Sequence, residues 1–270
     1  MKNTLFIFFA SLVLFTGCKK SDRDEDDSTN SSEDYALSTG LIMDVFKIVH
    51  QASNTSSGIV SSTSLDSNSV FGCDTIIFDA LSSPKTLTIE FDENCTSSSV
   101  SRGGVIYSTY SGYYDVPGTV ITIHLYNYSY NEHVFYSGSI SCQLTDTSNG
   151  VYNYSFNTSD IKIKNKYNQN VFYNANYQIK VISGSNTPLF IDDEYLVTGS
   201  MTGRAFRGNG FSAQINDSLT ASGNCNWITS GNVSIKPDTK STRNLDFGGG
   251  GCDATITISI YELDYEYSIP

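Results

Sequence analysis

Residues 171–181, Val-Phe-Tyr-Asn-Ala-Asn-Tyr-Gln-Ile-Lys-Val, place apolar side chains at every second position and, after Phe172, polar side chains between them. Two further stretches repeat this period, and their apolar faces comprise Val134, Tyr136, Gly138, Ile140, Cys142 and Leu144 in the first and Ile256, Ile258 and Ile260 in the second. Successive side chains of a strand point to opposite faces of its sheet, and one dry face with one wet face is typical of antiparallel sheet. The sequence therefore predicts an all-β protein built of antiparallel strands.

Turn-forming residues separate these stretches, as in Pro117-Gly118, Ser148-Asn149-Gly150 and Arg207-Gly208-Asn209-Gly210. Such residues are typical of the loops that join neighbouring antiparallel strands. About a dozen strands fit between residue 70 and residue 270, and a sheet of that size has to protect its edges. We therefore expect one domain over residues 38–270, an antiparallel meander that forms a sandwich or a curled sheet.

One short helix is predicted over residues 38–52, ahead of the strands. Ser38 or Thr39 can cap it, and the apolar residues Leu41, Ile42, Val45, Phe46 and Val49 follow at helical spacing. This pattern predicts a helix with one apolar face. We expect His50, near the end of the helix, to be a surface residue that suits the helix dipole.

Composition restricts the function classes. The chain has 270 residues with 16 Lys+Arg and 28 Asp+Glu, which gives a formal net charge of -12. Nucleic-acid binding requires clustered basic residues that release counterions from phosphates, so this balance argues against a nucleic-acid partner. Charged residues make up 16 % of the chain and aromatic residues 13 %, including 18 Tyr. A polar, tyrosine-rich composition of this kind suits a β protein outside the cytoplasm.

The first residues resemble a bacterial lipoprotein signal. Lys2 precedes an apolar run over residues 5–15, which is too short to span a bilayer, and Leu14-Phe15-Thr16-Gly17-Cys18 resembles a lipobox. The resemblance implies cleavage after residue 17 and acylation of Cys18. The alternative is an ordinary signal peptide with an incidental Cys. Several acyl chains give durable anchoring, so the membrane is the expected partner through the lipid on Cys18.

Residues 18–37 are predicted to form the lipidated Cys and a flexible acidic tether. Residues 19–27 are almost all charged, and residues 28–34 are polar. Segments of this kind bury too little apolar surface to order themselves. The acidic cluster serves as a spacer or as a signal for export to the cell surface. We expect location at the outer membrane and leave open which side the domain faces.

Four of the six cysteines form a symmetric pattern. The midpoint between Cys73 and Cys95 falls at a turn containing Pro84, and the midpoint between Cys225 and Cys252 falls beside Pro237. The two cysteines of each pair are therefore expected to lie opposite each other across a hairpin, within the distance that a disulfide spans. An acid-Phe pair precedes both Cys95 (Glu90-Phe91) and Cys252 (Asp246-Phe247), which indicates a diverged internal repeat. A link between its two copies, Cys95 to Cys252, is the alternative. Cys142 is expected to be a buried free thiol.

Several motifs between Cys73 and the C-terminus resemble a group of uncharacterised Bacteroidota lipoproteins. They are residues 87–95, Ser101-Arg102-Gly103-Gly104, Tyr110-Ser111-Gly112-Tyr113, residues 192–199, residues 225–231 and residues 245–253. Members usually carry Gly where this chain has Asp92. The group has no assigned activity, so the resemblance implies a lipid-anchored all-β protein and no catalytic residues.

The sequence offers little catalytic chemistry. His50, His124 and His133 lack the spacing of zinc ligands, and we predict no metal and no cofactor. Asp192, Asp193 and Glu194 could supply carboxylates to a cation or a glycosidase, but adjacent acids are more often a solvated loop.

Tyrosines are the remaining resource. Tyr110, Tyr113, Tyr126 and Tyr128 lie in dense runs, and a Tyr on a wet sheet face can stack on a sugar or contact a protein. With Asp192 and Asp193 they are the candidate ligand contacts. The simpler interpretation is that Tyr favours half-buried strand positions.

These observations predict a non-enzymatic envelope lipoprotein, a binding or structural module with a glycan or protein ligand. The alternative is a glycan-binding or carbohydrate-active accessory enzyme that uses Asp192, Asp193 or Glu194.

Overall fold

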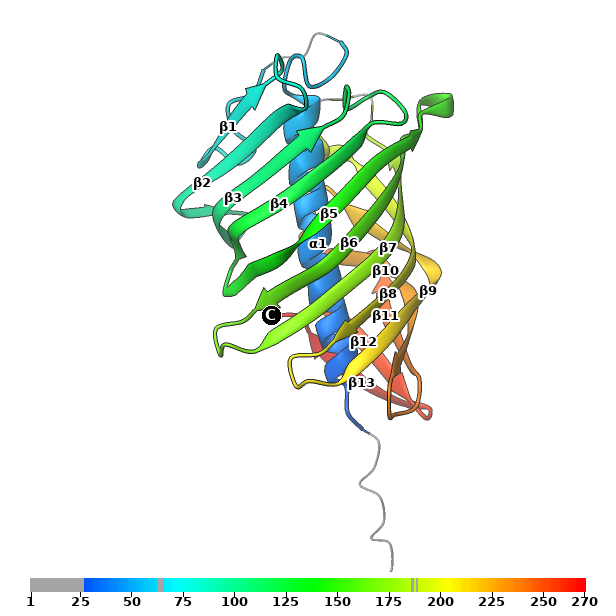
Figure 1. Cartoon of the computed structure of the whole chain (residues 1–270). Coiled ribbons are helices and arrows are strands. Elements are labelled where there is room, and N and C mark those ends of the chain that lie inside the picture. The colour runs from blue at the N-terminus through cyan, green and yellow to red at the C-terminus, as the bar shows by residue number, and fades with distance from the viewer. Residues whose placement is uncertain (1–26, 63–65, 186, 188) are drawn as a thin grey trace, which may run out of the picture.

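The computed structural model describes residues 27–62, 66–185, 187 and 189–270. These residues form one long helix, two short 3-10 helices and thirteen strands (Figure 1). The bounds are α1 (Asn30–Asn54), β1 (Asp74–Asp79), β2 (Lys85–Ser97), β3 (Val100–Tyr110), β4 (Val120–Tyr130), β5 (His133–Asp146), η1 (Ser148–Gly150), β6 (Asn153–Lys164), β7 (Asn170–Ser183), η2 (Phe190–Asp192), β8 (Glu194–Arg204), β9 (Gly210–Ser222), β10 (Ile228–Pro237), β11 (Arg243–Gly249), β12 (Thr255–Ile260) and β13 (Leu263–Ser268).

All thirteen strands belong to one antiparallel sheet in which sequence neighbours are also spatial neighbours, from β1 to β13. The predicted all-β antiparallel meander is confirmed. Figure 1 shows a single sheet curled around α1, which decides between the two architectures that the sequence left open. In β7, Val171, Tyr173, Ala175, Tyr177 and Ile179 all point inward and are buried, as the alternating pattern predicts.

The predicted face of β5 is only partly correct. Ile140, Cys142 and Leu144 are buried as predicted. In the first part of the strand, Phe135 is buried instead of the predicted Val134 and Tyr136, and Tyr136 is 58 % exposed. The strand shifts register around Gly138, which has φ +106°. A Cβ at this position would lie 2.6 Å from the backbone of Ile161, so only glycine fits this bulge. The bulge moves the first part of β5 to the opposite alternation.

The helix is longer and more buried than predicted. It begins at Asn30, so the tether expected over residues 18–37 is corrected at residues 30–37, which are helical. The tether prediction assumed that the polar residues of this segment are solvated. The curled sheet and its connecting loops instead bury nearly all of α1, and they supply partners to its polar residues, as when the backbone N–H of Phe206 in the β8–β9 turn donates to Asp34 at 2.8 Å.

Aromatic rings hold the centre of the helix against the sheet. The ring of Phe46 makes edge-on contacts with Tyr154, Phe156 and Tyr195, at centroid distances of 5.4–5.8 Å. One and a half turns earlier, Gly40 lets the indole of Trp227 approach, since a Cβ there would lie 3.3 Å from the ring. The interior is therefore one continuous core between the helix and the inner face of the sheet.

Both predicted disulfides are confirmed. Cys73–Cys95 links the two strands of the first hairpin, with Cα atoms 5.2 Å apart, and Cys225–Cys252 closes the open end of the β10–β11 hairpin at 5.6 Å. Cys142 is a buried free thiol, and burial raises its pKa well above the usual range.

We expect non-reducing peptide mapping of the purified protein to recover the 73–95 and 225–252 links. Cys142 should react with an alkylating reagent only after denaturation, because its sulfur is buried and its thiolate is disfavoured. Reduction should lower the free energy of unfolding by about 3 kcal/mol per bridge on the chain-entropy estimate. A 95–252 link, or rapid labelling of Cys142 in the folded protein, would contradict this assignment.

Candidate functional site

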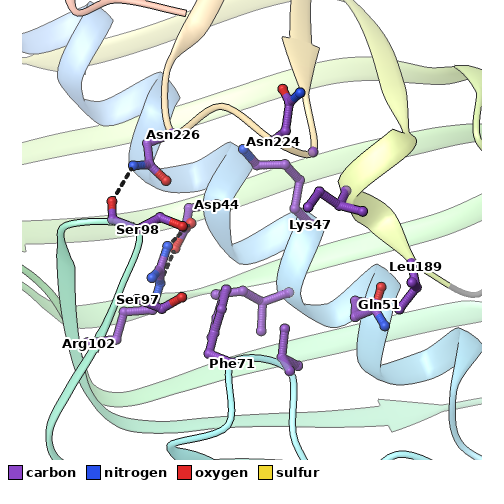
Figure 2. Close-up of a pocket in the computed structure, with 14 residues that line it drawn as sticks. Asp44, Lys47, Gln51, Phe71, Ser97, Ser98, Arg102, Leu189, Asn224 and Asn226 are labelled. Atoms are coloured by element: carbon purple, nitrogen blue, oxygen red, sulfur yellow. Dashed lines mark hydrogen bonds and ion pairs between the residues drawn. The ribbon is translucent and has the colours of Figure 1, made fainter.

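A pocket of about 380 Å³ lies beside the middle of α1, where loops from distant parts of the sheet meet. We call it the loop pocket. The helix contributes one side, and four connections contribute the rest: the segment before β1, the β2–β3 turn, the β7–β8 connection and the β9–β10 connection (Figure 2). The lining comprises Asp44, Lys47, Ile48, Gln51, Val70, Phe71, Ser97, Ser98, Arg102, Leu189, Ile191, Gly223, Asn224 and Asn226.

A buried ion pair forms the inner wall of the loop pocket. Arg102 donates two hydrogen bonds to the carboxylate of Asp44, at 2.6 and 3.1 Å, and the hydroxyl of Tyr128 donates a third at 2.7 Å. Burial opposes the charge on Arg102, but Asp44 outweighs this effect and raises the pKa of the guanidinium. Burial likewise raises the pKa of Tyr128, so its hydroxyl stays a donor. Asp44 is thus fully occupied as an acceptor inside the protein.

The guanidinium of Arg102 also lies against two rings. Its central carbon is 4.3 Å from the ring centroid of Phe71 and 5.3 Å from that of Tyr130. Such contacts favour a cation in a site with little water. The Nη1 atom has no hydrogen-bond partner among the described residues. Arg102 therefore combines a satisfied ion pair with a buried Nη1 that has no partner among the described residues.

Lys47 is the second cation of the loop pocket. Its ammonium donates to the carbonyls of Cys225 at 2.7 Å and Ser222 at 3.3 Å, which fixes the β9–β10 connection to the helix. These bonds use two of its three donors. Burial lowers the pKa of Lys47 to about 8, so the side chain is still largely charged at neutral pH.

One hydrogen bond ties the two sides of the mouth together. The side-chain amide of Asn226 donates to the carbonyl of Ser98 at 3.1 Å, which joins the β9–β10 connection to the β2–β3 turn (Figure 2). Asn224 lies beside it on the same connection, and Leu189 and Ile191 give the opposite rim two exposed aliphatic side chains. The mouth thus offers amides and hydroxyls on one side and apolar surface on the other.

A second polar cluster lies around His50, which is buried, so its predicted surface position is corrected. Its Nδ1 lies 2.5 Å from the hydroxyl of Tyr114, and its Nε2 lies 3.3 Å from Asp193. The hydroxyl of Tyr195 donates to the same carboxylate at 2.7 Å. A Tyr–His–Asp chain resembles a proton relay, but His50 and Asp193 are each only 3 % exposed. The cluster joins the end of α1 to the start of β8.

The six predicted ligand contacts do not form one site. Tyr110 and Tyr128 are buried against the helix, where the Tyr110 hydroxyl lies 2.7 Å from Ser53. Tyr113 and Tyr126 are exposed on other surfaces, at 42 % and 56 %. Asp193 is buried beside His50, and Asp192 accepts a hydrogen bond from Thr187. Two of the six touch residues of the loop pocket: Tyr128 bonds Asp44, and the carbonyl of Asp193 accepts a hydrogen bond from the backbone N–H of Gly223 at 2.9 Å.

The sequence did contain a signal for this pocket. Asp44, Lys47 and Gln51 recur at spacings of three and four, which places them on one side of a helix whose other positions are mostly apolar. The predicted apolar face of the helix does not include these three residues, and the sequence alone assigned them no role. The role of Arg102 has no local signal in the sequence, because its ion-pair partner Asp44 lies 58 positions away.

Comparisons of this chain with protein-family models, with curated proteins and with solved structures each found no match. Within the described residues, no three His, Cys, Asp or Glu side chains are grouped so that they could hold a metal ion. Across the same part of the chain, no helix combines the length and the apolar character needed to cross a membrane. Cys18 lies outside the described residues.

The lowered pKa of Lys47 predicts a pH-dependent stability. Between pH 8 and 10.5 the unfolded chain still binds a proton that the folded chain has lost, so the free energy of unfolding rises with pH. From pH 7 to about pH 9.5, the wild type should gain roughly 2 kcal/mol relative to Lys47→Met. Urea unfolding at both pH values measures this difference. The matched variant Lys180→Met, at an exposed position, should keep the wild-type slope; parallel curves for wild type and Lys47→Met would refute the assignment.

Proposed function

We propose that this protein is a lipid-anchored envelope lipoprotein, a non-enzymatic module that binds a small polar ligand in the loop pocket. The observation that carries the proposal is the pocket itself, which combines two cations, several amides and hydroxyls, and apolar walls in about 380 Å³. Ligand sites in proteins are concave, mainly apolar, and contain a few polar groups that fix orientation. The resemblance to Bacteroidota lipoproteins supports the same class.

The charges of the pocket favour an anionic ligand. Asp44 neutralises Arg102, which leaves Lys47 as the unbalanced charge. One donor of Lys47 has no acceptor among the described residues. Asn224, Asn226 and the nearby serines suit hydroxyl groups. A sugar that carries a carboxylate, such as a uronic acid, matches both features.

The carbohydrate-active alternative has less support. Glycosidases use two carboxyl groups that flank the scissile bond. Among the described residues that line the loop pocket, Asp44 alone is acidic, and its oxygens are held by Arg102 and Tyr128. Asp193 is buried with His50, away from solvent. The arrangement therefore favours binding over hydrolysis.

We expect the detergent-purified full chain to be stabilised against heat by glucuronate or galacturonate, and at least tenfold less effectively by glucose or galactose. A hydrogen bond to a charged group contributes about 1.5–3 kcal/mol, which corresponds to at least a tenfold difference in affinity. Melting curves at increasing sugar concentration measure the effect. Equal responses to acidic and neutral sugars, or no response to either, would contradict the proposal.

Two asparagine variants locate the binding. Asn224→Ala removes an amide from the pocket rim and should weaken uronate binding about tenfold. The matched control is Asn216→Ala on the outer side of β9. Each asparagine bonds a serine hydroxyl, Asn224 that of Ser222 and Asn216 that of Ser234, so the control should leave binding unchanged. The proposed site fails if the two variants behave alike.

The anchor is tested separately. Cys18→Ser should abolish metabolic labelling with a radioactive fatty acid and leave the protein unprocessed or released from the membrane, because the acylated thiol is gone. Membrane fractionation of both proteins provides the measurement. Unlabelled wild type, or equal labelling of the variant, would rule out the lipobox.

A further inference from the structure

The outer face of the sheet carries a row of aromatic and basic side chains across four adjacent strands. It comprises Tyr136 of β5, Lys162 and Lys164 of β6, Phe172 of β7 and Arg204 of β8. The ammonium groups of Lys162 and Lys164 lie 5.0 and 4.8 Å from the ring centroid of Tyr136, and the guanidinium carbon of Arg204 lies 4.8 Å from that of Phe172. We call this set the aromatic–basic row. Its rings hold the cations in place on an exposed surface.

The row concentrates positive charge on an acidic protein. Residues 27–270 contain twelve Lys and Arg, and five of them lie in the row or in the adjoining β6–β7 and β8–β9 turns, namely Lys162, Lys164, Arg204, Lys166 and Arg207. Of the other seven, Lys47, Arg102 and Arg243 are buried. Glu132, next to the row, is paired with Lys166 at 2.6 Å. The acidic residues of β13, Asp264 and Glu266, lie five strands beyond β8 in the strand order.

The row lies toward the end of the sheet at which the chain enters the domain. The first turns of α1, the β4–β5, β6–β7 and β8–β9 turns, and Tyr267 of β13 with Pro270 line a common cavity of about 440 Å³ at this end. Lys164 is followed directly by the β6–β7 turn, which carries Lys166 and the 72 % exposed Tyr167. Figure 1 shows the start of α1 and these turns together at the lower end of the sheet. Arg243 holds the carbonyl of Ser28 there, at 3.0 Å.

Chain length brings this end close to the membrane if Cys18 carries the anchor. Nine peptide steps separate Cys18 from Asp27, and a fully extended chain covers at most about 3.5 Å per step, or roughly 30 Å in all. The opposite end of the sheet cannot reach the bilayer as easily. Basic side chains near an anionic surface each contribute about a fivefold gain in affinity, and aromatic rings favour the headgroup region.

We propose that the aromatic–basic row docks on the anionic phospholipid headgroups of the membrane that carries the anchor. The proposal rests on the proposed lipid anchor and adds an orientation to it. Docking turns the outer face of β5–β8 toward the bilayer.

Acetylation of lysines in the reconstituted, lipidated full chain tests the orientation. Vesicles of phosphatidylcholine alone are compared with vesicles in which about a third of the lipid is phosphatidylglycerol. Mass spectrometry measures the acetylation rate of each lysine. Lys162 and Lys164 should be protected at least fivefold in the anionic vesicles, and the protection should disappear at high salt. Lys180, eight residues along β7 from Phe172 and about 26 Å away, is the internal control and should react equally in both.

Variants give the second readout. Lys162→Glu with Lys164→Glu should reduce the protection of Lys166 to its level in phosphatidylcholine, whereas Lys180→Glu should leave it unchanged. The docking would be overturned if Lys162 and Lys164 were protected equally in both kinds of vesicle. It would also be overturned if Lys180 were protected as strongly as they are. Protection by a soluble anionic polysaccharide and not by phosphatidylglycerol would also overturn it. Failure of the wild type to float with any vesicle would instead count against the anchor.

Discussion

Enclosure of α1 by the sheet is the constraint on which the rest of this structure depends. A helix surrounded by protein has no solvent for its polar side chains, so each needs a partner on the inner face of the sheet. Thr39 meets the hydroxyl of Tyr173, Ser53 meets Tyr110, and Asp44 meets Arg102. These bonds fix how far each strand lies along the helix.

The same constraint explains the use of tyrosine. Nine of the 18 tyrosines are buried, namely Tyr35, Tyr110, Tyr114, Tyr128, Tyr130, Tyr154, Tyr173, Tyr177 and Tyr195. A tyrosine ring fills the space between sheet and helix, and its hydroxyl can bond a polar helix residue at the far end. Phenylalanine would fill the space and leave groups such as Asp44 without a donor. The sequence interpretation that placed tyrosines on a wet face considered the sheet without its helix.

What could be predicted from the sequence follows the range of each interaction. Alternation in 171–181 and the symmetric spacing of Cys73 and Cys95 are local, and both were interpreted correctly. Burial of His50 depends on Tyr114 and Asp193, which lie 64 and 143 positions further along the chain, so no local pattern reports it. The face change in β5 depends on a close approach to Ile161 in the next strand. The loop pocket is formed by four connections that are far apart in the sequence, and only the spacing of its helix residues is visible as a local pattern.

The position of α1 also has a mechanical consequence. The helix is the first element of the domain, so the chain enters through the centre of the curled sheet instead of through an edge strand. Tension on the N-terminal segment therefore pulls along the axis of a helix held by side-chain bonds to many strands. An edge strand would unzip one hydrogen bond at a time, whereas this attachment has to shear all of its contacts together.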